Sequence, residues 1–116
     1  MPIAKIDDKG FQKQVLECPL PVIVVFEKNF WGTSCIMKPI IEEIAKEYDD
    51  KIIIFKYNLE ENSIIANNYR VENSTTILIF HKANVIYKTG VISKRELTNL
   101  INSLFSDYLK MKQLDK

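Results

Sequence analysis

The chain has 116 residues, of which 47% are hydrophobic and 27% charged, and its formal net charge is +1. This length suits a single domain spanning residues 1–116, and the composition is typical of a globular protein. Because Lys and Arg are spread among Asp and Glu, the basic patch of a nucleic-acid-binding protein is not expected. The longest apolar stretches, VIVVF (22–26) and KIIIFKYNL (51–59), are too short to span a membrane. The first ten residues lack the apolar region of a secretory signal, so we expect a cytoplasmic protein.

The first half of the chain alternates between predicted helices and strands. Residues 8–17 favour a short helix, which the prolines of CPLP (18–21) end. The β-branched run VIVVF is typical of a strand buried on both faces. Residues 34–48 carry apolar side chains at steps of three and four and predict an amphipathic helix, which Pro39 should kink. The residues of this stripe are Met37, Ile40, Ile41, Ile44, Ala45 and Tyr48.

The second half predicts a buried strand at 51–59, a short helix at 62–69, two strands and a last helix. Ile64, Ile65 and Tyr69 are the expected apolar contacts of the short helix. TILIF (76–80) and VIYKT (85–89) are separated by HKAN and suit a hairpin. SKRE (93–96) has the spacing of a capping box and predicts a helix start. The apolar face of that helix is predicted to be core: Leu97, Leu100, Ile101, Leu104, Phe105, Tyr108 and Leu109.

The resulting order is α, β, α, β, α, β, β, α, which predicts an α/β fold with parallel pairing first and an antiparallel hairpin at the edge. With its proline-kinked second helix and closing hairpin, the chain resembles the thioredoxin family over roughly residues 8–110. The stretches that carry the resemblance are KPIIEEIAKEYDDKIIIFKYNLEEN (38–62), YRVENSTTILIF (69–80) and TGVISKRELTNLI (89–101). The resemblance implies a thioredoxin fold, a central mixed sheet of about four to five strands with helices on both faces.

Thioredoxins act through a Cys-Gly-Pro-Cys motif whose first Cys lies eight residues before the kink proline. Counted back from Pro39, the motif positions read Trp31, Gly32, Thr33 and Ser34, so both redox positions lack sulfur. Cys35 comes one residue later, a rotation of about 100° on a helix. A competing alignment, shifted by one residue, places Cys35 at the second Cys of the motif and needs an insertion and a compensating deletion.

Two further features of the family are absent. The resemblance places Val25 where thioredoxins carry a buried Asp, and Thr75 where they carry a cis-proline. A cis bond before a non-proline residue costs about 2.5–4 kcal/mol, so we expect a trans peptide before Thr75. Lys56 matches the buried Lys of the family and has lost its carboxylate partner, so we expect its side chain to extend toward water.

The two cysteines, Cys18 and Cys35, precede and follow the strand at 22–26, so we expect them at opposite ends of the sheet and unable to pair. Cys35 lies in the predicted first turn of a helix, where the dipole favours a reactive thiolate. It is either a candidate single thiol or a partly buried packing residue, and Cys18 is expected to pack at a helix end. Two cysteines and His81 are too few for the usual zinc site, so neither metal nor cofactor is expected.

The remaining candidates have ordinary structural readings. Thr33 or Ser34 is expected to cap the helix, because no His or carboxylate is placed to activate either hydroxyl. His81 is expected to face solvent at the hairpin. In the family, target polypeptides lie across a groove at the motif end of the sheet, which implies Phe30, Trp31, Ser74, Thr75, Thr89 and Gly90 as groove residues here. Phe30 and Trp31 either bind such a partner or fold back over the sheet edge.

The sequence therefore supports a thioredoxin-fold protein without the dithiol pair, which binds a protein or peptide at the former active-site face as a monomer or weak dimer. The alternative is a thiol-disulfide oxidoreductase or redox sensor that acts through Cys35. A third reading is a structural subunit with an unused groove. Fold alone does not decide among them.

Overall fold

A computed structural model describes residues 3–28, 32–71 and 75–114, with the backbone alone for residues 33, 34 and 107–114. Its helices are α1 (Asp8–Phe11), the π-helical segment η1 (Gln12–Leu16), α2 (Gly32–Glu47), α3 (Ile64–Asn68) and α4 (Lys94–Leu114). Its strands are β1 (Ala4–Ile6), β2 (Val22–Glu27), β3 (Ile53–Asn58), β4 (Thr76–His81) and β5 (Asn84–Thr89). No helix of the described part is long and apolar enough to cross a membrane.

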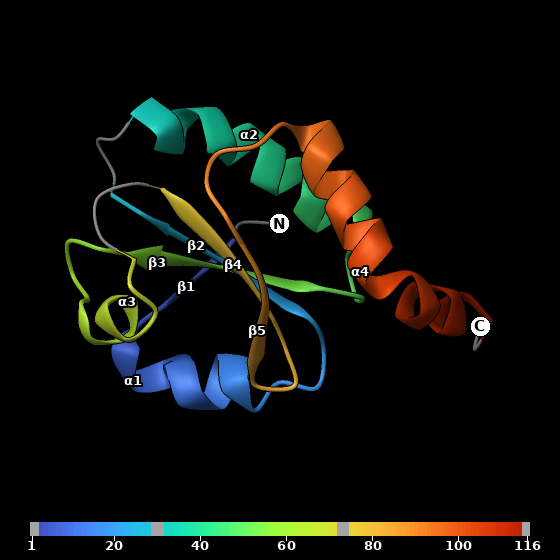
Figure 1. Cartoon of the computed structure of the whole chain (residues 1–116), viewed down its shortest axis with the longest axis horizontal. Coiled ribbons are helices and arrows are strands. Elements are labelled where there is room, and N and C mark those ends of the chain that lie inside the picture. The colour runs from blue at the N-terminus through green and yellow to red at the C-terminus, as the bar shows by residue number, and fades with distance from the viewer. Residues whose placement is uncertain (1–2, 29–31, 72–74, 115–116) are drawn as a thin grey trace.

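The five strands form one mixed sheet in the order β1-β3-β2-β4-β5 (Figure 1). β1 and β2 run parallel to β3, while β4 runs antiparallel to both β2 and β5. Helices α2 and α4 lie on one face of the sheet, and α1 and α3 lie on the other (Figure 1). The predicted mixed sheet with helices on both faces is therefore confirmed.

The core has two halves because successive residues of each strand point to opposite faces of the sheet. From β2, Ile23 and Val25 join the half beneath α2 and α4, whereas Val24 and Phe26 join the half beside α1 and α3. All four side chains are no more than 1% exposed. Burying each contributes roughly 1.5–3 kcal/mol, which explains why an unbroken apolar run forms the central strand.

The first turn of α4 is capped by the predicted residue, whereas the first turn of α3 is capped by a side chain from another helix. Ser93 Oγ accepts from the backbone amide of Glu96 at 3.1 Å, which is one of the two bonds of a capping box and confirms the predicted helix start; it also donates to the carboxylate of Glu96 at 3.2 Å. The amides of Ser63, Ile64 and Ile65 donate instead to the carboxylate of Asp8, at 3.1 to 3.2 Å. A side chain from α1 thus holds the first turn of α3.

Several element boundaries differ from the sequence prediction. The three residues of β1 were not predicted as a strand, because AKI is too short to show alternation. The helix expected at 8–17 continues beyond α1 as η1. The prediction that Ile64 packs in the core is wrong, since it is 64% exposed; Ile65 and Tyr69 do pack against the core beside α3. Helix α3 is one turn long and presents few residues inward.

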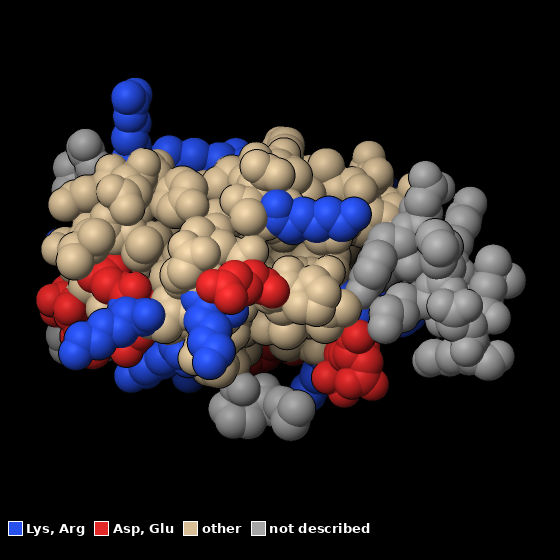
Figure 2. All heavy atoms as spheres, turned by 90° about the horizontal axis from the view of Figure 1, so that it is seen from below, with Lys and Arg blue, Asp and Glu red and all other residues tan. Residues whose placement is uncertain are grey.

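The surface shows charges of both signs. In Figure 2, which looks at the molecule from the side of α1, acidic and basic side chains mix along the lower half of the view. Most of the upper half of the same view is uncharged (Figure 2). This face of the described part therefore carries no continuous basic stripe.

Candidate functional site

The candidate site is the end of the sheet at which β2 leads into α2. β2 ends at Glu27, and α2 begins at Gly32. Phe30, Trp31 and Ser74 lie outside the described residues. Gly32 is exposed, and a Cβ built on it would have no heavy atom within 4 Å, so the start of α2 is open to approach.

The first turns of α2 present one face to solvent and one to the core. Cys35 is exposed with a free thiol, and Ile36 next to it is 57% exposed, whereas Met37 is fully buried. The reading of Cys35 as a partly buried packing residue is therefore wrong. Cys35 lies two residues before the buried Met37, and because each helical step rotates the side chain by about 100°, it points to the opposite side of α2. Ile36 was not among the predicted site residues, although it stands next to the predicted stripe.

The strand register places Thr75, Thr89 and Gly90 at this same end of the sheet. Thr76 pairs with Phe26 near the end of β2, and Ile77 pairs with Thr89 at the end of β5. The carbonyl oxygen of Thr75 lies 3.7 Å from the place where a Cβ on Gly90 would be. Two of the predicted groove loops thus meet through their backbones.

Thr75 contributes little side-chain surface to this end of the sheet. It is 2% exposed, and Thr76 beside it is 7% exposed. A partner that lies against this segment would therefore meet mainly its backbone. The peptide bond before Thr75 involves Ser74 and lies outside the described residues, so the expected trans isomer stays a prediction.

The interior behind the site is apolar where the family carries an acid. Val25 is 1% exposed and pairs in register with Lys56 on β3 and with Ile77 on β4. Lys56 is half-buried and borders a hollow of about 80 Å³ with Lys5 and Glu27. The expected extension of the Lys56 side chain toward water stays a prediction.

The two cysteines lie at opposite ends of β2. Cys18 comes before β2 and packs, half-buried, against the core beside α1, while Cys35 comes after it, on α2. The six residues of β2 span about 20 Å at roughly 3.3 Å each. A disulfide needs Cα atoms within about 7 Å, so the two thiols cannot pair in this fold.

Two minor predictions about polar residues are wrong. Thr33 and Ser34 were expected as helix caps, but both lie inside α2, so the capping position precedes Gly32 and falls outside the described residues. His81 was expected to face solvent, but it is half-buried and its ring packs edge-on against Phe105, with 5.5 Å between centroids. Burial, together with the charge of Lys82, lowers the pKa of His81. His81 is therefore a packing residue against α4.

No three His, Cys, Asp or Glu side chains of the described residues cluster in a way that could hold a metal ion. The features that the structure does bring together at this end are an exposed thiol, an exposed Ile36 and the two meeting loops at Thr75 and Gly90.

The sheet order, the proline inside α2 and the site at the end of β2 define a protein with the thioredoxin fold. The thioredoxin family model matches residues 2–103, and the chain belongs to this family. It is similar to thioredoxin of Buchnera aphidicola subsp. Acyrthosiphon pisum, 36% identical over 105 residues that cover 86% of this chain and 94% of that protein. Thioredoxin of Rickettsia felis is 36% identical over 98 residues, covering 84% and 93%, and thioredoxin 1 of Synechococcus elongatus is 31% identical over 100 residues, covering 85% and 94%.

Proposed function

We propose that this thioredoxin-family protein binds an extended protein or peptide segment at its former active-site face and does not catalyse dithiol exchange. The observation that carries the proposal is the separation of its two thiols by the length of β2. Dithiol exchange needs a second thiol to resolve the mixed disulfide formed by the first. Cys18 cannot reach Cys35, and the motif positions Trp31 and Ser34 carry no sulfur.

Three properties of the site support binding. Ile36 exposes 57% of its surface near the start of α2, five residues after Trp31 and four after Gly32, and Trp is enriched among residues that dominate interfaces. Gly32 leaves open space beside them. The loops at Thr75 and Gly90 meet at this same end of the sheet, and in this proposal the extended segment lies across them. In this proposal the partner covers Phe30, Trp31 and Ile36 and runs along the loop at Ser74 and Thr75.

The exposure of Cys35 favours one alternative, a single-thiol redox activity, and the names of the thioredoxin relatives point the same way. In this reaction the Cys35 thiolate attacks one sulfur of a disulfide such as oxidised glutathione. The protein–glutathione disulfide forms, and one glutathione thiolate leaves. No second thiol of this chain can then release the protein, so turnover requires an external thiol.

A disulfide-reduction assay with insulin as substrate and dithiothreitol as donor separates the two functions. For the proposed binder, the wild-type chain leaves the rate at that of dithiothreitol alone, and Cys35→Ser changes nothing. Acceleration by the wild type that disappears in Cys35→Ser would overturn the proposal in favour of the single-thiol enzyme.

Binding is tested with variants of the exposed apolar residues. A partner segment, once identified by capture on the wild-type chain, is synthesised and its Kd measured by calorimetry. Trp31→Ala and Ile36→Ser are each expected to weaken binding about tenfold or more, as truncation of a central interface residue does. Val85→Thr is the matched control, because Val85 is 38% exposed and pairs with Phe80 at the opposite end of the sheet. Equal affinities for all four chains would contradict the proposed face.

A further inference from the structure

A hollow of about 440 Å³ lies between β5 and α4. Tyr87 of β5 pairs in register with Ile79, which belongs to the core beneath α2 and α4, so the hollow lies on that face of the sheet. Its described lining comes from β5, from the loop after it and from the first half of α4, and includes Tyr87, Thr89, Ile92, Glu96, Leu100 and Ser103.

The hollow continues the face at the start of α2. Thr89 lines the hollow and ends β5, and Gly90 after it approaches the backbone of Thr75. Val91 is exposed and Ile92 lines the hollow, so apolar side chains connect the two places. An extended segment that crosses the loops at Thr75 and Gly90 can therefore run on between β5 and α4.

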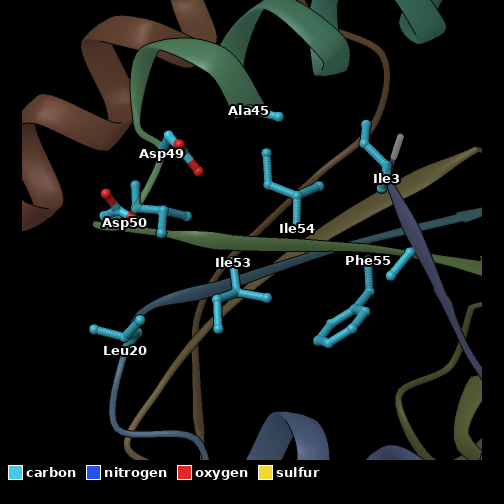
Figure 3. A pocket seen from close by; sticks show the side chains of 10 residues that line it. Ile3, Leu20, Ala45, Asp49, Asp50, Ile53, Ile54 and Phe55 are labelled. Atoms are coloured by element: carbon cyan, nitrogen blue, oxygen red, sulfur yellow. The ribbon is translucent and has the colours of Figure 1, made fainter. Parts of the chain in front are cut away.

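Another hollow, of about 390 Å³, has no such connection. It lies at the start of β3, with Ile3, Leu20 and Ala45 in its wall (Figure 3). β2 and β3 run parallel, and the face at α2 lies where they end, so this hollow is at the opposite end of the sheet. Of these two hollows, the one at α4 alone can extend the proposed face.

The hollow at α4 has apolar walls and a negative charge at its rim. Tyr87 and Leu100 line it from β5 and α4, and Leu100 also packs against the core. Glu96 is exposed and is the charged residue among the described lining. The ion pairs of the described residues are those of Lys94 with α2, so Glu96 takes part in none. A ligand that carries both an apolar side chain and a basic group complements this lining.

The spacing along α4 matches that of an extended chain. Glu96 and Leu100 are four residues apart, which places them on the same face of the helix with a rise of about 6 Å between them. In an extended chain, side chains two residues apart point the same way and are separated by about 6.6 Å. A basic residue followed two positions later by an apolar residue therefore meets Glu96 and Leu100 together.

We propose that the hollow between β5 and α4 binds the continuation of the partner segment, which carries a basic residue and, two positions later, a large apolar residue. The basic side chain reaches Glu96, and the apolar side chain enters between Tyr87 and Leu100. The preceding residues of the segment lie across Thr75 and Gly90. This inference rests on the function proposed for the face at α2 and adds the chemistry by which that face selects its partner.

The probe is the synthetic peptide Val-Ile-Val-Thr-Arg-Thr-Leu-Thr, titrated into the full ¹⁵N-labelled chain while amide resonances are followed by NMR. We expect shifts at Ile36 and Gly90 on the face and at Tyr87, Ile92 and Leu100 around the hollow. The matched peptide, with Glu in place of Arg and Ala in place of Leu, is expected to shift only Ile36 and Gly90 and to bind about tenfold more weakly.

The contrary shift patterns separate this inference from the proposed function. Shifts confined to Ile36 and Gly90 with both peptides would show that the hollow is not used, and the proposed function would stand. Shifts confined to Tyr87 and Leu100 would show a separate site that does not continue the face. Absence of shifts at millimolar peptide would also contradict the inference, whereas the proposed function is judged with the captured partner. Concentration-dependent shifts around the hollow without peptide would identify a second copy of the chain as its occupant and overturn the inference.

Glu96→Gln tests the charge at the rim. Glutamine keeps an oxygen for the hydroxyl of Ser93, and the variant should weaken binding about threefold and reduce its dependence on salt, because exposed ion pairs contribute modestly. Glu42→Gln, on an exposed residue of α2 outside the hollow, should leave the Kd unchanged. With a peptide that has Gln in place of Arg, Glu96→Gln should have no effect, since the double-mutant cycle isolates this one contact. An equal loss with both peptides would contradict the pairing.

Tyr87→Ala tests the apolar wall and should weaken binding about fivefold. Val85→Ala is the matched control, because Val85 is 38% exposed against 43% for Tyr87 but pairs with Phe80, which belongs to the other half of the core. Equal affinities for the wild type and Tyr87→Ala would show that the hollow does not hold the apolar residue, and would overturn the proposal.

Discussion

At the scale of single residues, Asp8 has the most demanding role in the described structure. Its carboxylate accepts from the hydroxyl of Tyr57 at 2.5 Å and from the amides of Ser63, Ile64 and Ile65. The hydroxyl of Tyr57 accepts from the next amide, that of Ala66, at 3.3 Å. Burial by itself raises the pKa of Asp8, but these hydrogen bonds outweigh it and hold the pKa below its ordinary value.

Asp8→Asn should therefore destabilise the protein by about 2 kcal/mol at pH 7, because an amide cannot accept all four hydrogen bonds and carries no charge. A carboxylate whose folded pKa is lowered contributes fully above its unfolded pKa, near 4, and the contribution is lost as the pH falls through the folded value. The difference between variant and wild type should thus be constant from pH 7 to about pH 5 and shrink below about pH 4.

Urea unfolding of both chains between pH 3 and pH 7 measures this difference. Asp49→Asn, which changes an exposed Asp in the turn after α2, should alter the free energy of unfolding by less than about 0.5 kcal/mol. A pH-independent loss in Asp8→Asn would show that the shape of the side chain, and not its charge, holds α3.

The sequence predicted the environment of residues where it depends on their neighbours in the chain. It did not predict the environment of residues whose contacts come from distant parts of the chain. It placed Val25 in the core, because a β-branched run leaves no other place for it. It missed the link from Asp8 to α3, since 55 to 57 residues separate the partners. It also misplaced His81, whose burial depends on Phe105 of α4. At the candidate site, the exposure of Cys35 and Ile36 depends on the rotation of α2 against the sheet, which periodicity defines only coarsely.

At the scale of elements, the β4–β5 hairpin has the correct turn length with unfavourable turn residues. The two residues of the turn, Lys82 and Ala83, have φ angles of 53° and 71°. Two-residue hairpin loops favour such left-handed conformations because their twist matches that of the strands, and Asn-Gly is the usual sequence. Here the strand pairing of His81 with Asn84 enforces the turn on residues that carry a Cβ.

Ala83→Gly should consequently stabilise the protein, by about 1 kcal/mol, because glycine adopts positive φ without the steric cost that alanine bears. Thermal and urea unfolding of the variant check this. The same substitution inside α2, Ala45→Gly, should cost about 1 kcal/mol. The two changes are expected to shift the free energy of unfolding in opposite directions. A destabilised Ala83→Gly chain would contradict the prediction, because it would show that relief of the positive φ is smaller than the entropy cost of glycine.

At the scale of the whole molecule, the sequence predicted the mixed sheet because alternating helices and strands allow few arrangements. It did not predict the short β1 or its pairing with β3. β1 pairs with β3 over only three residues. A segment this short shows no periodicity in the sequence from which its pairing could be predicted. The face at the start of α2 is therefore implied by the family motif, whereas the pairing of β1 with β3 is visible only in the folded chain.

The alignment that assigns Trp31 and Ser34 to the redox positions can be tested by restoring the sulfur. A chain with Trp31→Cys, Ser34→Cys and Cys35→Ser should accelerate insulin reduction by dithiothreitol about tenfold or more, because two thiols then occupy the motif spacing. The shifted alignment predicts the opposite, that Gly32→Cys with the native Cys35 creates the active pair. Both pairs are three residues apart, so they differ only in register.

The comparison is sharp because both chains should fold. A Cβ on Gly32 meets no atom within 4 Å, so a failure of Gly32→Cys to act cannot be assigned to a clash at that carbon. If only the chain with cysteines at positions 31 and 34 is active, the motif of this protein has lost both thiols. That result would also support the proposed binding function. Activity of the Gly32 pair alone would place Cys35 at the resolving position of the family and favour the single-thiol function instead.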